Sequence, residues 1–260
     1  FGPRWVFCIT ALLPLITLGF SFVINEERQR DHKSMDVKAQ LQIQCQKLWI
    51  IAKQPAIFYP AIFIFLFQAT PVPEGAFFFF KTEKLGFHAD FLGQINFISR
   101  VAMLLGVGLY NYSLKNVSLR ELFRWIIVAG LVLGSTQLIL VSGFNRTLGI
   151  SDQLFAMGDT ALLTVLAQLS FMPLLVLAAQ ICPEGVEATL FATLMSILNS
   201  GSFTGSFLGG VLTSWLGVTS DNFDNMFLLV AVCTVLSAAP LLLLHLVPET
   251  ITSEERKDAV

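Results

Sequence analysis

The segment Ile181–Gly210, ICPEGVEATLFATLMSILNSGSFTGSFLGG, decides which fold the sequence predicts. Pro183 and Gly185 near its start cannot continue a helix from the preceding residues. Glu184 and Glu187 stand where a new helix would begin, and carboxylates suit the positive end of a helix dipole. The remainder is long, apolar and uncharged, and three glycines recur every four residues on one helix face: Gly201, Gly205 and Gly209. The segment therefore predicts a membrane helix whose small-residue face lets a neighbouring helix approach closely.

The whole chain has the composition of a membrane protein. Of its 260 residues, 55% are hydrophobic and only 13% are charged, whereas charged residues make up about a quarter of ordinary soluble domains. Seven apolar spans are long enough to cross a bilayer as helices, and no alternating pattern of strands interrupts them. These spans are Trp5–Ile24, Phe58–Phe80, Phe91–Tyr112, Leu122–Gly143, Leu154–Ala179, Ala188–Leu216 and Phe227–Leu246. The expected fold class is an all-α membrane protein.

Other kinds of site find little support in the sequence. The chain lacks the basic face that nucleic acids require, and its net charge is only −2. The four cysteines lie far apart without C-x-x-C spacing, and the three histidines form no cluster with them. We therefore expect no metal site, no cofactor and no nucleic-acid partner.

Prolines interrupt the second apolar span. Pro71 and Pro73 lie within its hydrophobic length, where they free backbone carbonyl groups. Broken helices are tolerated at membrane depth where they line a cavity or pack on protein. In transporters such breaks often mark the substrate site, so this span is a candidate for binding.

Charged residues inside the spans are the next candidates. Arg100 lies near the middle of the third span, where an arginine is costly unless it faces a cavity, pairs with an acid or binds an anion. Glu74 follows the proline break and is the expected partner of Arg100, or else a residue that reaches the outer surface. It is also a candidate for proton coupling, as is Asp159, for which a solvated or helix-start position near the outer mouth is expected.

Four stretches together carry a family resemblance across nearly the whole chain. They are FIFLFQATPVPEGAFFFF (63–80), LLGVGLYNYSLK (104–115), VSGFNRTLGISDQLFAMGD (141–159) and CPEGVEATLFATLMS (182–196). With them the sequence resembles the folate–biopterin transporter family, a branch of the major facilitator superfamily, and the plant members in particular. The resemblance implies a proton-coupled secondary transporter of folates or pterins, and a plastid envelope is one membrane that fits it.

The resemblance also implies how the chain is divided. A complete member has twelve helices, so this chain would be the C-terminal half together with the last helix of the N-terminal bundle. We expect that last helix at residues 1–24, a linker at 25–54, a six-helix bundle at 55–248 and a tail at 249–260. Lys and Arg are concentrated in the linker and the tail, which places both in the cytosol or stroma. The linker is either a solvated connector or, over Val37–Ile51, an amphipathic surface helix.

The resemblance further suggests substrate contacts. The paired N–H donors of the Arg100 guanidinium would suit the glutamate carboxylates of a folate. Gln68, Gln168 and Asn199 lie within spans and would hydrogen-bond the edge of a pterin ring, although bonds between helices would equally explain them. The expected partners are a folate or pterin, the lipid bilayer and the N-terminal half of the same transporter. A carrier of another organic anion and a non-transporting receptor or scaffold are the alternative functions.

Overall fold

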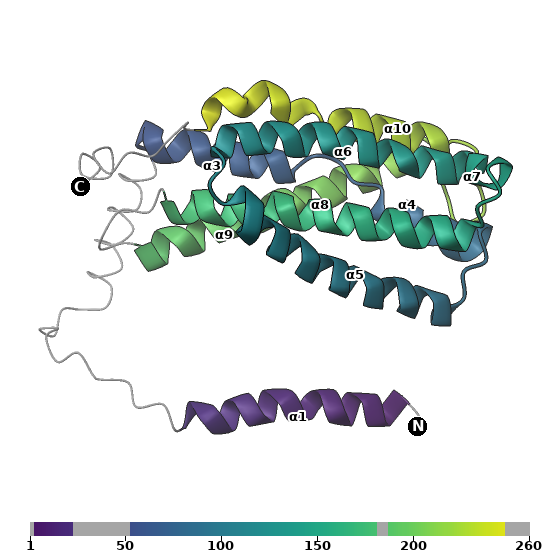
Figure 1. The fold of residues 1–260 in the computed structure, drawn as a ribbon, viewed down its shortest axis with the longest axis horizontal. Coiled ribbons are helices and arrows are strands. Elements are labelled where there is room, and N and C mark those ends of the chain that lie inside the picture. The colour runs from purple at the N-terminus through teal and green to yellow at the C-terminus, as the bar shows by residue number, and fades with distance from the viewer. Residues whose placement is uncertain (1–2, 23–52, 181–186, 248–260) are drawn as a thin grey trace, which may run out of the picture. The chain divides into compact units, whose positions relative to one another are not determined.

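The computed structural model describes residues 3–22, 53–180 and 187–247, which form helices and connecting loops with no strand among them (Figure 1). The chain divides into two compact units, Phe1–Cys45 and Gln46–Val260. In the first unit, α1 (Pro3–Ser21) is an apolar helix with Pro14 in its interior. The all-α class predicted from the sequence is confirmed for the part of the chain that the structure describes.

Some expectations concern residues outside the described ranges. These are residues 25–52 of the linker with the amphipathic segment Val37–Ile51, the breaker residues Pro183, Glu184 and Gly185, and the tail 249–260. They stay predictions.

The second unit holds the remaining helices. They are α3 (Pro55–Gln68), α4 (Glu74–Phe79) with the π-helical turn η1 (Phe80–Lys84), α5 (Ala89–Leu109) with the π-helical turn η2 (Tyr110–Leu114), α6 (Leu119–Ser142), the short α7 (Phe144–Thr147), α8 (Asp152–Gln180), α9 (Glu187–Trp215), α10 (Met226–Leu236) and the 3-10 helix η3 (Ala239–Leu246).

Four helical segments are long and apolar enough to cross a membrane: Ala89–Leu114, Leu119–Ser142, Asp152–Gln180 and Met226–Leu246. They correspond to four of the seven expected spans. The helix α9 is also long enough to cross a membrane. It is less apolar than these four segments, because glycine, serine and threonine make up much of its sequence. The helix α3 is shorter because the second span breaks after it.

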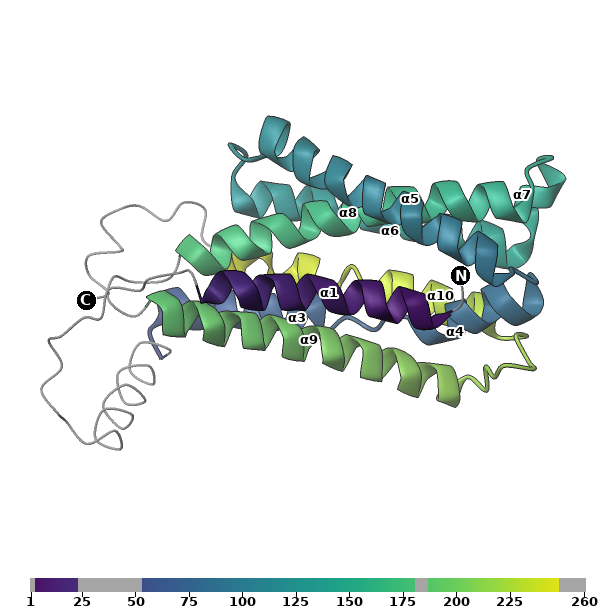
Figure 2. The ribbon, with the colours of Figure 1, turned by 90° about the horizontal axis from the view of Figure 1, so that it is seen from below.

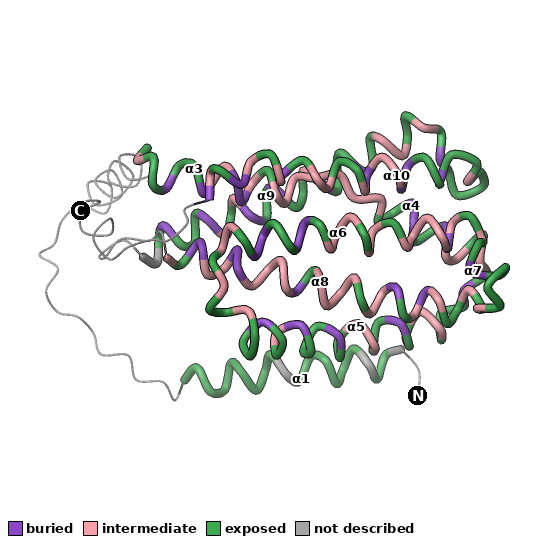
Figure 3. Tube along the Cα trace, turned by 45° about the horizontal axis from the view of Figure 1, so that its top comes forward, coloured by how far each residue is buried: buried purple, intermediate pink, exposed green. Residues whose placement is uncertain are grey.

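The helices of the second unit pack in two groups. In one group, α5 and α6 both pack on α8; in the other, α3 packs on α9 and on η3, and α10 joins the groups through its contact with α6 (Figures 1 and 2). Buried residues are distributed along the helices of this unit (Figure 3). Phe63 of α3 and Phe123 of α6 are fully buried and meet edge to face, with ring centroids 5.0 Å apart. Burial of large apolar side chains such as these holds the two groups together.

The predicted break in the second span is confirmed. The helix α3 ends at Gln68, and α4 begins at Glu74 after five residues that form no helix. Pro71 and Pro73 cannot donate a backbone hydrogen bond, so the helical ladder cannot continue through them. Pro173, by contrast, lies inside α8, which runs through it as one helix.

The glycine face of α9 packs directly on the end of α3 and on the loop that follows it. A Cβ added to Gly201 would lie 2.7 Å from the Phe65 carbonyl oxygen, and one added to Gly205 would lie 2.6 Å from that of Thr70. At Gly209 the added atom would lie only 1.9 Å from the Val72 carbonyl oxygen. The Val72 N–H also donates a 3.3 Å hydrogen bond to the Gly205 carbonyl. We call this contact of the three glycines with residues 65–72 the glycine contact.

The last apolar span is not one continuous α-helix. The helix α10 ends at Leu236, and the chain continues as the 3-10 helix η3, which has Pro240 among its first residues. Pro240 lacks the N–H that an α-helix would need there. At the far end of η3, the guanidinium of Arg120 donates two hydrogen bonds, of 3.0 and 2.7 Å, to the Val247 carbonyl. This contact ties the end of η3 to the start of α6.

The glycine contact makes a prediction about stability. Gly209→Ala should destabilise the protein by about 1–3 kcal/mol, because the new methyl group meets backbone that cannot move aside. Gly210→Ala is the matched control, since nothing lies within 4 Å of an added Cβ there and the helix propensity changes equally. The unfolding midpoint of each purified variant in detergent checks this. Equal midpoints for the two variants would show that the glycine contact is looser than described.

Candidate functional site

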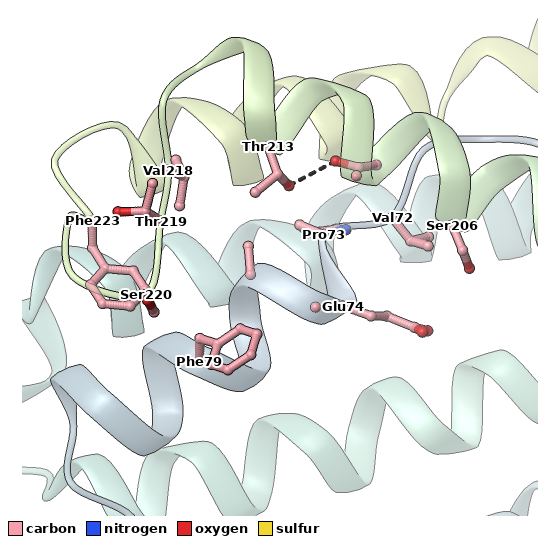
Figure 4. Close-up of a pocket in the computed structure, with 14 residues that line it drawn as sticks. Val72, Pro73, Glu74, Phe79, Ser206, Thr213, Val218, Thr219, Ser220 and Phe223 are labelled. Atoms are coloured by element: carbon pink, nitrogen blue, oxygen red, sulfur yellow. Dashed lines mark hydrogen bonds between the residues drawn. The ribbon is translucent and has the colours of Figure 1, made fainter.

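Glu74 lies where three cavities meet. It is the first residue of α4, directly after the loop that the glycine contact holds, and its side chain is exposed. Figure 4 shows one of these cavities, with Glu74 extending away from Phe79 and Phe223. No hydrogen bond or ion pair joins the Glu74 carboxylate to another described residue. A carboxylate that opens on three cavities without an internal partner can meet a ligand or a proton.

Each cavity is named here by one of its lining residues. The Phe79 cavity, of about 570 Å³, lies between α4, α9 and the loop after α9. The Lys81 cavity, of about 470 Å³, lies between α4, α5, α6 and α8. The Gln168 cavity, of about 520 Å³, reaches from α3 to α8 and α9. Volumes of this order are typical of small-molecule sites.

The Lys81 and Gln168 cavities adjoin. Glu74, Thr164 and Ala167 line both of them. Hydroxyl and amide side chains are frequent in their walls, among them Asn96, Ser99, Gln137, Thr160, Thr164, Ser170, Ser202 and Ser206, and they alternate with Phe67, Phe77, Phe78 and Phe171. A wall of aromatic faces and uncharged hydrogen-bonding groups suits a flat, polar organic molecule.

The structure brings Gln68 and Gln168 to the same cavity, one from α3 and the other from α8. Neither side-chain amide makes a hydrogen bond to a described residue, although Gln168 is buried. The start of the Gln168 side chain packs closely on Gly106 of α5. A Cβ added to Gly106 would lie only 2.8 Å from the Cβ of Gln168. The two amides are therefore available to a molecule in the Gln168 cavity.

Arg100 and Asn199 lie elsewhere. Both are exposed, and neither lines the Phe79, Lys81 or Gln168 cavity. Residues one helical turn from Arg100 do line cavities, since Asn96 lines the Lys81 cavity and Met103 lines the Gln168 cavity, but Arg100 itself lines neither. The expected ion pair with Glu74 does not form, and Arg100 makes no hydrogen bond to any other residue in the described ranges.

The prediction that Asp159 is solvated is wrong. Its side chain is buried, two turns into α8, and accepts a hydrogen bond from the Thr136 hydroxyl of α6. It also lies within electrostatic range of Lys81. The acid at the start of α8 is the half-buried Asp152, which pairs with Arg146 at 2.7 Å; this pair raises the pKa of the Arg146 guanidinium above its usual value.

Lys81 is a cavity residue that the sequence analysis did not single out. It is half-buried, with its ammonium nitrogen 4.9 Å from the centre of the Phe77 ring. Glu74, Phe77, Phe78 and Lys81 all line the Lys81 cavity, at helical spacings of three, four and seven residues. The spacing of seven residues between Glu74 and Lys81 is the feature of the sequence from which Lys81 could have been predicted as a cavity residue.

Comparison with known proteins decides the family, because a profile of the BT1 family matches residues 1–260. The chain belongs to the BT1 family. It is therefore an integral, multi-pass membrane protein, and its likeness to the folate–biopterin transporters is confirmed.

Three relatives of this BT1 family chain bear related names. It is 45% identical over 248 residues to a protein of Synechocystis named folate-biopterin transporter, covering 95% of this chain and 50% of the relative. It is 31% identical over 258 residues to folate transporter 2 of Plasmodium falciparum, covering 98% and 55%. It is 36% identical over 201 residues to probable folate-biopterin transporter 4 of Arabidopsis thaliana, covering 77% and 41%.

The BT1 chain thus spans about half the length of the curated relatives it matches. No solved structure matches it. The names of these relatives point to transport of a small molecule and not to catalysis.

The buried acid of the site makes a second prediction about stability. Thr136→Val keeps the shape of the side chain but removes the hydroxyl that donates to Asp159, which should cost roughly 1–3 kcal/mol because a buried acceptor loses its partner. Ser135→Ala is the control, since the Ser135 hydroxyl bonds only the Leu131 carbonyl of its own helix. Thermal unfolding in detergent measures both, and an equally small shift for the two variants would contradict the importance of this bond.

Proposed function

We propose that the full-length protein is a secondary transporter of folates and related pterins, and that this chain supplies its C-terminal half. The polar, aromatic-lined cavities around Glu74, in a chain whose relatives are named folate-biopterin transporters, carry this proposal. The six-helix unit from Pro55 onward forms one wall of the substrate path, and an N-terminal bundle of the same protein forms the other. Rocking of one bundle against the other exposes the site to each side in turn.

The break between α3 and α4 supports a binding role for this region. In many transporters the substrate binds where a membrane helix is interrupted, because the freed backbone and the adjacent side chains can face a cavity. Here the break directs Glu74 to three cavities at once. The linker and the tail lie on the cytosolic or stromal side, and a plastid envelope is one membrane that fits this orientation.

Glu74 is the proposed proton carrier. Neutralising it should abolish the dependence of uptake on an inward proton gradient, because a glutamine can neither gain nor release a proton. Uptake of labelled folic acid into cells that express the full-length protein is measured at an outside pH of about 5, which supplies an inward proton gradient, and of about 7, which does not. Glu74→Gln should give equal rates at the two pH values.

Glu83→Gln is the matched control for that experiment. Glu83 lies on the same helical segment but is exposed and lines none of the three cavities. It should keep the pH dependence of the wild type. A Glu74→Gln protein that still follows the proton gradient would remove Glu74 from the coupling mechanism.

Arg100, one helical turn from the cavity residues Asn96 and Met103, is the proposed contact for an anionic group that extends out of the cavities. Arg100→Gln should raise the KM for folate roughly tenfold, the effect of losing one charge-assisted hydrogen-bond pair. Arg124→Gln is the comparison, since Arg124 is an exposed arginine near the start of α6 and lines none of the three cavities. An unchanged KM in Arg100→Gln would remove this residue from the substrate path.

Substrate competition separates the alternative functions. Folate uptake that pterins and folates inhibit more strongly than other organic anions supports the proposal, and the reverse order favours a carrier of another organic anion. Binding of folate without uptake into proteoliposomes would instead indicate a receptor or scaffold.

A further inference from the structure

Lys81 is the one basic residue that lines the three cavities around Glu74. Lys84 of η1 and Arg100 of α5, by contrast, are exposed and line none of them. A positive charge inside a membrane bundle is costly, and it is usually associated with a substrate path or a counter-charge. Lys81 therefore calls for an explanation that a surface lysine does not.

The ammonium of Lys81 contacts an aromatic ring but forms no ion pair or hydrogen bond with another described residue. Phe77 lies one turn before it, and the 4.9 Å distance to the ring centre is a cation–π contact. Asp159 acts on it through space, yet no ion pair or hydrogen bond joins Lys81 to any residue in the described part of the chain. An ammonium group has three N–H donors, and here these are free for a ligand.

The Gln168 cavity, which adjoins the Lys81 cavity, has a different chemistry. Gln68 and Gln168 offer uncharged amides to the Gln168 cavity, which no basic residue lines. The two cavities adjoin, since Glu74, Thr164 and Ala167 line both, and an elongated molecule is the kind of ligand that could extend from one toward the other. Such a molecule would place its anionic end by Lys81 and its neutral, hydrogen-bonding end by the two glutamines.

Resting on the proposed function, we propose that Lys81 binds the carboxylate end of a folate while Gln68 and Gln168 take the pterin ring, so that Lys81 sets the preference for folates over uncharged pterins. A folate carries a glutamate with two carboxylates at the end opposite its pterin ring, whereas biopterin has no carboxylate. Only the folate gains from the ammonium. Asp159, held by Thr136, compensates the lysine when the site is empty.

The test measures uptake of labelled folic acid and of labelled biopterin by the same full-length protein. Lys81→Met keeps a long apolar side chain and removes the charge. It should lower kcat/KM for folic acid about tenfold relative to that for biopterin, the loss expected for one charge-assisted contact. Lys81→Arg should restore the wild-type ratio, because it returns a cation to the same helix position.

Two further variants act as controls. Lys84→Met removes a charge three residues away that lines no cavity around Glu74, and it should leave the ratio unchanged. Gln168→Leu should lower the uptake of both substrates together, because both contain the pterin ring. Loss of folate uptake alone in Lys81→Met, together with loss of both substrates in Gln168→Leu, would establish that the carboxylate end lies by Lys81 and the pterin ring by Gln168.

A loss of Lys81 could also leave Asp159 as an uncompensated buried charge and impair folding. The double variant Lys81→Met with Asp159→Asn removes both charges together, and it should show the same selective loss of folate uptake. Surface expression and elution as a single species in detergent are measured for every variant.

The outcomes separate the two proposals. If the wild type takes up neither substrate, the proposed function fails. If the wild type takes up both and the folded Lys81→Met protein keeps the wild-type ratio, or loses both substrates equally, the assignment of Lys81 is overturned while the transport function stands.

Discussion

The glycine contact is the constraint on which the rest of the site depends. Gly201, Gly205 and Gly209 let α9 touch the backbone of residues 65–72, and the Val72 N–H bonds across to Gly205. Two prolines end the helix in this region, so its backbone would otherwise lack partners within the bilayer. Close packing on α9 gives the loop a fixed shape, and the loop in turn determines where α4 begins.

Once α4 is placed, its side chains are placed with it. Glu74 opens the helix at the junction of the three cavities, and Lys81 follows on the same face two turns later. An acid and a base thus line one cavity without forming a direct ion pair. Separation of this kind keeps both groups available to a substrate or a proton, which a closed salt bridge would prevent.

Much of this arrangement could be predicted from the sequence, and the reasons for the failures are physical. Pro71 and Pro73 predict the helix break, because proline lacks the backbone N–H that a helix needs and this effect depends on the local sequence alone. The burial of Asp159 could not be predicted, because it depends on Thr136 of another helix. Lys81 follows an apolar run and looks like a loop residue, but the helix continues through it as η1, so that it lines the same cavity as Glu74 seven residues earlier. Arg100 lies mid-span, yet its side chain is exposed and lines none of the three cavities.

The 3-10 helix at the end of the last span has a consequence for how the protein fits its bilayer. Each residue in a 3-10 helix advances about 2.0 Å, against about 1.5 Å in an α-helix, so the eight residues of η3 extend roughly 4 Å further than α-helical ones would. The span reaches across a thicker hydrocarbon layer without extra residues. The pitch of one short helix thus bears on the hydrophobic thickness that this span can match.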